Sequence, residues 1–185
     1  MGANANGDGC FVFADSSSVS KTSCFNANVF VVRAFGGFFF LTGCPQAPPP
    51  SNCNDFNYTG AQLPAGSSAW AAYSDRKSKD NIEQVNARQV LDKLLAIPIA
   101  TWNWKAQDAR IRHMGPMAQD FHAAFAIGED DKHISTVDSE GVALAAIQGL
   151  HQLVQEKDSE ITRLKARSDT LERKLRAIEV KLGLN

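Results

Sequence analysis

Charged side chains are scarce in the first part of this 185-residue chain and abundant in the rest. Up to position 73 the charged residues are Lys21, Arg33, Asp8, Asp15 and Asp55. The formal net charge is -1, and neither part carries a basic excess. This balance argues against a general affinity for nucleic acid or for anionic membranes. The chain divides into two regions of different chemistry, 1–73 and 74–185.

Long apolar runs are also missing. No window approaches the roughly 18 consecutive apolar residues of a membrane-spanning helix, so we expect no membrane insertion. The first residues, MGAN, lack the basic and apolar regions of a signal peptide. We interpret this N-terminus as the edge of a fragment.

Closely spaced cysteine pairs are absent too. Cys10, Cys24, Cys44 and Cys53 all lie in the poorly charged region, and none forms the CxxC pattern of a zinc site. We expect no metal and no cofactor. A disulfide between Cys44 and Cys53 would close the Pro-rich loop PQAPPPSN, which would suit an extracellular or virion surface protein. Buried free thiols are the alternative, because spacing alone does not determine how four cysteines pair.

Apolar residues at helical spacing are missing from the first region as well. The runs CFVFADSSS and NVFVVRAFGGFFFL are rich in β-branched and aromatic residues and predict β-strands. So many Phe side chains with so little charge would give a monomer exposed apolar edges and faces. We therefore expect three chains to intertwine over 1–73, as in trimeric fibres. The phrase NGDGCFVFADSS also resembles the repeats of bacterial trimeric adhesin heads, which implies that 1–73 is the β-rich end of a fibre or adhesin. A loop and linker is expected over QAPPPSNCNDFNYTGAQLPAGSSAW.

From residue 74 the pattern changes to short helices and strands, which predicts a small α+β domain. NARQVLDKLLAI has apolar residues at helical spacing before Pro98 and predicts a helix. In ATWNWK the two Trp residues alternate with polar residues, which predicts a strand with Trp102 and Trp104 packed on one face. RHMGPMAQDF predicts a turn leading into a short helix. Asp138 is expected to be the N-cap of a long final helix.

That final helix follows a heptad repeat. With Ile147 at an a position, nine of the eleven a and d positions up to Leu182 are apolar. Over about five heptads this pattern predicts a parallel coiled coil at about 143–183. Lys157 and Ser168 interrupt it. The apolar positions, called the seam residues below, are Ile147, Leu150, Val154, Ile161, Leu164, Leu171, Leu175, Ile178 and Leu182.

Charges beside the seam favour a homo-oligomer over a single surface helix. In a parallel, in-register assembly each g residue faces the next e residue of its neighbour. These pairs are opposite in sign and comprise Glu160 with Lys165, Arg167 with Glu172, and Lys174 with Glu179. Each exposed pair contributes well under about 1 kcal/mol, so the pairs set the register while the seam supplies stability. Mixed Leu and Ile at the seam do not by themselves choose a trimer over a dimer.

Several segments taken in order carry a resemblance. SDRKSKDNI, QVLDKLLAIPI, TWNWK, RHMGPMAQDF, STVDSEGVALAAIQGL and the terminal heptads resemble the C-terminal intramolecular chaperone domain of phage tail spikes, tail fibres and endosialidases. The resemblance runs from Ser74 to the C-terminus and implies a homotrimer. It implies that the domain assists trimerisation of the fibre attached to its N-terminal side, which is its folding client. Many members then release themselves by self-cleavage at a serine that has a lysine partner.

The family motif has Ser followed by Asp, with Lys five residues after the Ser. These residues are Ser74, Asp75 and Lys79 here, while Ser78 stands where the family more often has Leu. The resemblance implies a single-turnover serine autopeptidase with Ser74 as nucleophile and Lys79 as general base. An ordinary lysine, with a pKa near about 10.4, is protonated at neutral pH. Burial on assembly would therefore have to favour the free amine and so time the reaction.

The bond that is cut stays open. Attack of Ser74 on the carbonyl carbon of Tyr73 passes through a five-membered ring and cuts before Ser74. Attack of Ser74 on its own carbonyl would need a strained four-membered ring. A cut between Ser74 and Asp75 therefore requires Ser74 of a neighbouring chain or an activated water.

Two other functions stay open beside this one. The first is a structural trimeric tip of a fibre or surface adhesin, in which Ser74 does no chemistry and nothing is cleaved. The second is an adhesin whose N-terminal part binds a host-surface receptor, which is compatible with either. The expected location is a phage virion, as a tail fibre or spike, or a bacterial cell surface, with the chaperone part released after cleavage.

Overall fold

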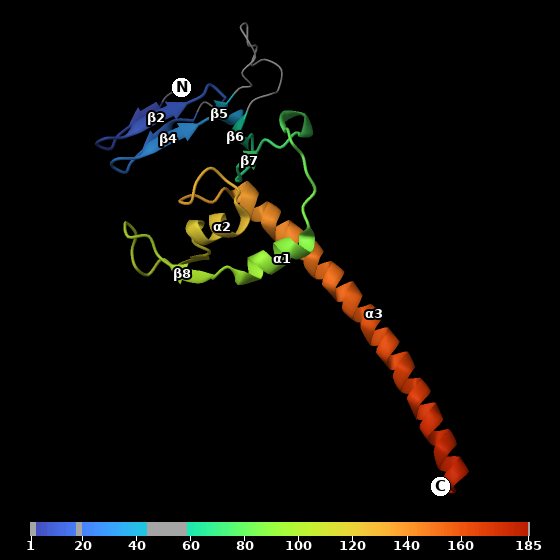
Figure 1. The fold of residues 1–185 in the computed structure, drawn as a ribbon. Coiled ribbons are helices and arrows are strands. Elements are labelled where there is room, and N and C mark those ends of the chain that lie inside the picture. Colours follow the sequence, from blue (N-terminus) through green and yellow to red (C-terminus); the bar gives the residue numbers. More distant parts are fainter. Residues whose placement is uncertain (1–2, 18–19, 44–58, 185) are drawn as a thin grey trace. The chain divides into compact units, whose positions relative to one another are not determined.

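The computed structural model describes residues 3–17, 20–43 and 59–184 and has an α+β fold with small sheets and one long helix. The chain forms two compact units, Met1–Ile82 and Glu83–Asn185, and Figure 1 shows the elements of each. Among the described residues, no helix is both long enough and apolar enough to cross a membrane.

Two parallel strand pairs begin the first unit. β1 (Ala3–Ala5) pairs with β3 (Thr22–Cys24), and β2 (Phe11–Ala14) pairs with β4 (Phe30–Arg33). β2 and β4 run side by side in Figure 1. The prediction of strands in CFVFADSSS and NVFVVRAFGG is confirmed. In both strands Val and Phe residues suit the pleated, half-buried surface.

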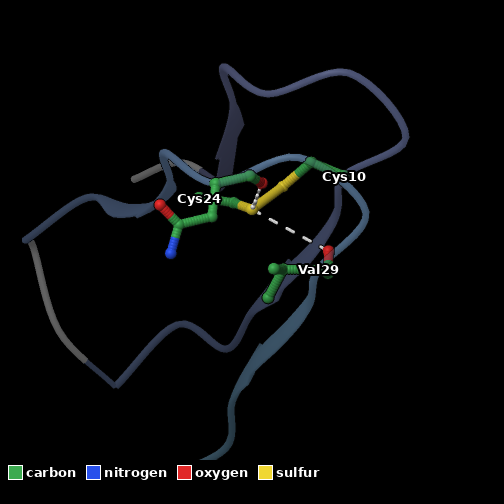
Figure 2. Close-up of a disulfide and its surroundings, with 4 residues drawn as sticks. Cys10, Cys24 and Val29 are labelled. Carbon is green, nitrogen blue, oxygen red and sulfur yellow. Dashed lines mark hydrogen bonds between the residues drawn. A yellow bond between two sulfur atoms is a disulfide. The ribbon is translucent and has the colours of Figure 1, made fainter. Parts of the chain in front are cut away.

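A disulfide joins Cys10 to Cys24, with their Cα atoms 6.4 Å apart (Figure 2). Cys24 is only 2% exposed, and its Sγ lies 3.2 Å from the carbonyl oxygen of Asn26 and 3.8 Å from that of Val29. The pairing that the sequence suggested, Cys44 with Cys53, lies outside the described residues. Cys10 and Cys24 therefore form a disulfide and are not free thiols.

An antiparallel sheet follows in the first unit, in the order β5 (Gly37–Gly43), β6 (Thr59–Pro64) and β7 (Ala71–Ala72). The sequence prediction of a loop is wrong for β6. Gly60 explains the error, because a Cβ there would collide with the carbonyl of Phe40, so this glycine permits a close strand approach. Pro64 is tolerated because, within the described part of the chain, β7 pairs only with Ala61 and Gln62, so β6 is an edge strand on that side at Pro64. Residues 46–58 of the predicted linker lie outside the described residues, and residues 65–70 contain no helix or strand, as predicted.

The second unit begins with the predicted helix. α1 (Ala87–Ala96) is capped by Asn86, whose side chain accepts hydrogen bonds from the backbone N–H groups of Arg88 and Gln89. The helix ends before Pro98, which lacks the N–H needed to continue it. The prediction of a helix in NARQVLDKLLAI is confirmed.

A two-stranded sheet and a short helix come next. β8 (Ala100–Trp102) pairs antiparallel with β9 (His113–Gly115), and α2 (Ala118–Phe125) follows. The predicted short helix is confirmed, but His113–Gly115 is a strand rather than a turn. The predicted strand through Trp104 is wrong as well, since the strand ends at Trp102. The two indole rings nevertheless touch edge to face, with centroids 4.8 Å apart.

The last element is α3 (Thr136–Leu182). Its N-cap is Ser135, so the prediction of Asp138 as the cap is wrong. Asp138 instead lies in the first turn, where a negative charge is favoured by the helix dipole. Val142 packs with Ile97 and Phe121 in the core of the unit, and Figure 1 shows α1 against the first part of α3.

Candidate functional site

A single turn of helix organises the segment around Ser74. The 3₁₀-helix η1 (Arg76–Ser78) directly follows Ser74 and Asp75. Asp75 is its N-cap, because its carboxylate accepts a 2.9 Å hydrogen bond from the backbone N–H of Lys77. The N–H of Lys79 donates to the carbonyl of Arg76 at 3.2 Å and closes the turn. Residues on either side of this turn are thereby brought back toward each other.

The turn places the two predicted catalytic side chains in contact. Lys79 Nζ donates a 2.6 Å hydrogen bond to Ser74 Oγ. A separation of five residues would put these side chains far apart in an extended strand, whose rise is about 3.3 Å per residue. Here η1 shortens that path. The geometry therefore brings together a hydroxyl and the amine that a Ser/Lys mechanism would use.

Asp75 is occupied by the turn rather than by the lysine. Its carboxylate caps η1, and among the ion pairs of the described residues none joins Lys79 to Asp75 or Asp80. Only the general preference of Asp for N-cap positions points to this capping role from the sequence. Tyr73, on the other side of Ser74, is half-buried.

Ser78, the departure from the family motif, also takes part in the turn. Its hydroxyl donates a 2.7 Å hydrogen bond to the carbonyl of Asp75, and its backbone N–H donates to the same oxygen at 3.2 Å. A leucine could make only the second of these bonds. Ser78 is half-buried, whereas Ser74 and Lys79 are both exposed in the single chain.

α3 presents two different faces in the single chain. Val142, Ala145, Ala146 and Gly149 are buried, and a Cβ at Gly149 would collide with the carbonyl of Ala87 at the start of α1. The seam residues, by contrast, are exposed, from 47% at Leu164 to 65% at Leu182. The face packed against α1 is therefore separate from the seam, which is left without a partner in the single chain.

One charged residue in the seam is paired within the helix. Lys157 Nζ donates a 2.9 Å hydrogen bond to Glu160. This bond lowers the pKa of Glu160 and raises that of Lys157, each chiefly because of the other's hydrogen bond. Glu160 is also the residue predicted to meet Lys165 of a neighbouring chain, so the two pairings would compete.

The histidines and the acidic loop form local pairs. His133 Nδ1 lies 2.9 Å from Asp130, and His113 Nε2 lies 2.8 Å from Gln107. The described residues contain no group of three or more His, Cys, Asp or Glu side chains that could hold a metal ion. The ring of Trp102 contacts that of His113 in a tilted arrangement, with centroids 4.8 Å apart, and the Trp102 indole N–H is buried without a hydrogen-bond partner.

A comparison with known protein families finds a match for the segment that begins at Ser74. Residues 74–126 match the model of a peptidase family described as "Chaperone of endosialidase". The match begins at Ser74 and takes in Lys79, η1, α1, β8, β9 and α2. The resemblance read from the sequence is confirmed for this segment. A search of curated proteins found no match.

Proposed function

We propose that this chain is an intramolecular trimerisation chaperone joined to the β-rich end of a fibre, and that it releases itself by one self-cleavage beside Ser74. The observation that carries the proposal is the 2.6 Å hydrogen bond between Lys79 Nζ and Ser74 Oγ within a segment that matches the chaperone family. The client is the N-terminal β region and whatever fibre it belongs to. The proposed location is a phage tail or a bacterial surface.

The seam supports the trimeric part of the proposal. Nine large apolar side chains repeat along one face of α3, and all are exposed in the single chain. Burial of such a side chain contributes roughly 1.5–3 kcal/mol relative to leaving it in water. Because α1 packs on a different face, three α3 helices can meet along their seams without displacing it. Opposite charges at g and e positions favour the parallel arrangement.

The proposed chemistry needs only groups of this chain and water. The free amine of Lys79 takes the proton of Ser74 Oγ as this oxygen attacks the carbonyl carbon of Tyr73. The tetrahedral intermediate collapses when the Ser74 nitrogen leaves and takes the proton from Lys79. The ester now joining Tyr73 to Ser74 Oγ is hydrolysed by water, which leaves 1–73 and 74–185 as separate chains.

A cut on the other side of Ser74 would follow a different route. The hydroxyl would then have to come from a neighbouring chain, or Lys79 would have to activate a water that attacks the carbonyl of Ser74. The products would be 1–74 and 75–185. Both routes use the same two side chains, and the masses of the products distinguish them.

Assembly would supply the timing. In the single chain Lys79 is exposed, and its Nζ lies 2.6 Å from Ser74 Oγ. A base must accept a proton, and removal from water favours the neutral form of an amine. We infer that packing of neighbouring chains around η1 desolvates Lys79, so that cleavage follows trimerisation.

A non-cleaving trimeric tip is the second candidate. Its support is the same exposure of Ser74 and Lys79, since a solvated Ser–Lys hydrogen bond also occurs as an ordinary turn contact. In that case Asp75 and Ser78 would serve only to hold the turn, and the coiled coil would stay attached.

Intact-mass measurement of freshly expressed protein decides between the two candidates. We expect fragments that end at Tyr73 or Ser74 in the wild type and a full-length chain in Ser74→Ala and Lys79→Ala. Lys77→Ala is the matched control, because Lys77 lies in the same turn but contributes only its backbone N–H to the hydrogen bonds there. A wild-type chain that forms trimers and stays uncut would overturn self-cleavage and leave the structural tip.

A further inference from the structure

The two parallel strand pairs of the first unit share one offset. Ala3 pairs with Thr22 and Phe11 pairs with Phe30, and every other pair in both ladders keeps the same spacing along the chain. The bonds between the ladders follow it too, since the N–H of Asn28 donates to the carbonyl of Asp8 at 2.8 Å. Residues 3–17 and 22–33 therefore form successive coils of one parallel β-solenoid, called the parallel β-coil below, in which equivalent residues stack on one another.

Conformation and packing repeat with the coil. Gly9 and Asn28, which are equivalent positions, both have left-handed backbone, with φ of 67° and 57°. The ring of Phe11 stacks on that of Phe30 at 4.9 Å, close to the spacing between neighbouring strands. A Cβ at Gly7 would lie 2.6 Å from the carbonyl oxygen of the equivalent residue, Asn26. A small residue here lets the coils approach.

Only the β1–β2 edge of the described stack is open to a further coil. Beyond β4 the chain leaves the stack, because β5 pairs antiparallel with β6. On the other side, β1 and β2 each belong to a sheet of only two strands among the described residues. The N–H of Phe11 donates to the carbonyl of Val29, and that of Asp15 to Arg33. Since N–H groups alternate along a strand, those of Val12 and Ala14 point to the open edge.

We propose that the open β1–β2 edge is a docking surface for one more parallel coil of the same length and pattern. The occupant would place a small residue over Gly7, a left-handed Gly or Asn over Gly9, and an aromatic ring over Phe11. This inference rests on the proposed function and deepens it. The folding client of the proposed chaperone would then be a parallel β-coil whose successive coils stack in register.

An unpaired strand edge is a template for further strands. The contact between the two described coils indicates which strand would fit at this edge. The residues of the first coil that contact the second coil, Gly7, Gly9 and Phe11, would also contact a coil added at the open edge. In repeat architectures each unit contacts only its neighbours, so an added coil needs no other surface.

The test adds a coil in the Ser74→Ala background, which keeps the chain in one piece. One variant carries a second copy of residues 3–21 before Ala3, with Ser in place of the copied cysteine. The matched control carries the same added residues in scrambled order. Amide hydrogen exchange is then followed at Val12 and Ala14, with Phe11 and Phe13 as internal controls that already face β4.

We expect exchange at Val12 and Ala14 to slow about tenfold or more with the copied coil and to stay unchanged with the scrambled one. Equal rates in both variants would overturn the inference. Loss of protection at Phe11 and Phe13 with the copied coil alone would also overturn it, as would protection of Val12 in the parent chain. Cleavage measured separately without the Ser74→Ala change would report on the proposed function alone.

Discussion

The unit Met1–Ile82 holds its strands by backbone ladders and a disulfide, whereas Glu83–Asn185 is built by helices packing on a small apolar core. Both units expose many large apolar side chains, but in different patterns. In the first unit they are mostly Phe residues spread over several strands, such as Phe11, Phe30 and Phe39. In the second, the longest series lies along one face of one helix. In the proposed trimer, other chains would cover the first set of apolar side chains, and the second set would determine how the chains meet.

The largest effect is expected from a charge in the seam. Leu164→Glu would place three carboxylates together at a d position, which removes apolar burial and adds unpaired charge at a cost of about 3 kcal/mol or more per chain. We expect light scattering to show the mass of one chain instead of three, and self-cleavage to be lost.

The control for this change is Ala166→Glu, which adds the same charge at an f position on the outside of the predicted coiled coil. It should leave the assembly and its cleavage intact. If the wild type is a stable monomer, or if both variants assemble equally well, the seam does not drive association and the contrast between the two units loses its functional meaning.

The next largest effect is expected from the disulfide. Cys10 and Cys24 are separated by 14 residues, and a loop of about this length contributes about 3 kcal/mol by restricting the unfolded chain. Replacing both cysteines by Ser should lower protection of the β2 and β4 amides in hydrogen exchange and leave α1 unchanged. Equal loss in both units would show that they unfold together, contrary to the division into two compact units.

Smaller changes in stability are expected from replacing two glycines of α3 by Ala, and the two changes have opposite signs. Gly149→Ala forces a Cβ against the carbonyl of Ala87 and should destabilise the α1–α3 contact by about 1–3 kcal/mol. Gly141→Ala meets no atom within 4 Å and should stabilise the helix by up to about 1 kcal/mol. Denaturant unfolding followed by helical circular dichroism measures both. A neutral Gly149→Ala would mean that α1 can shift away from α3.

The helical unit was the more predictable from sequence, for a local reason. Apolar spacing at 3.6 residues and the stop at Pro98 identified α1, and the heptads identified α3. The error at Asp138 amounts to a few residues at a helix start, where Ser135 competed for the same role. The site in turn depended on the family motif, because nothing in SDRKSK alone predicts the 3₁₀ turn that joins Ser74 to Lys79.

The β unit was harder because its structure depends on partners distant in sequence. Propensity located the strands but not their parallel pairing, although FVFA and FVVR recur at the offset that the structure shows. A search for internal repeats would have found this signal. β6 was missed because Gly60 and Pro64 disfavour strands, and close backbone approach to Phe40 outweighs that preference. Cysteine pairing had no local signal at all.

The smallest effect is expected from acid, at the end of the β2–β4 ladder. Hydrogen bonds from the Ser17 hydroxyl and then from the Phe35 N–H lower the pKa of Asp15 below its usual 3.8. The carboxylate therefore contributes stability above about pH 3.8, and this contribution is lost as pH falls through the lower folded value. The Phe35 amide resonance should titrate with a midpoint below 3.8, and Asp15→Asn should abolish that titration. A midpoint at or above 3.8 would mean that Asp15 does not hold the turn after β4, which would leave the disulfide as the main constraint that distinguishes this unit from the helical one.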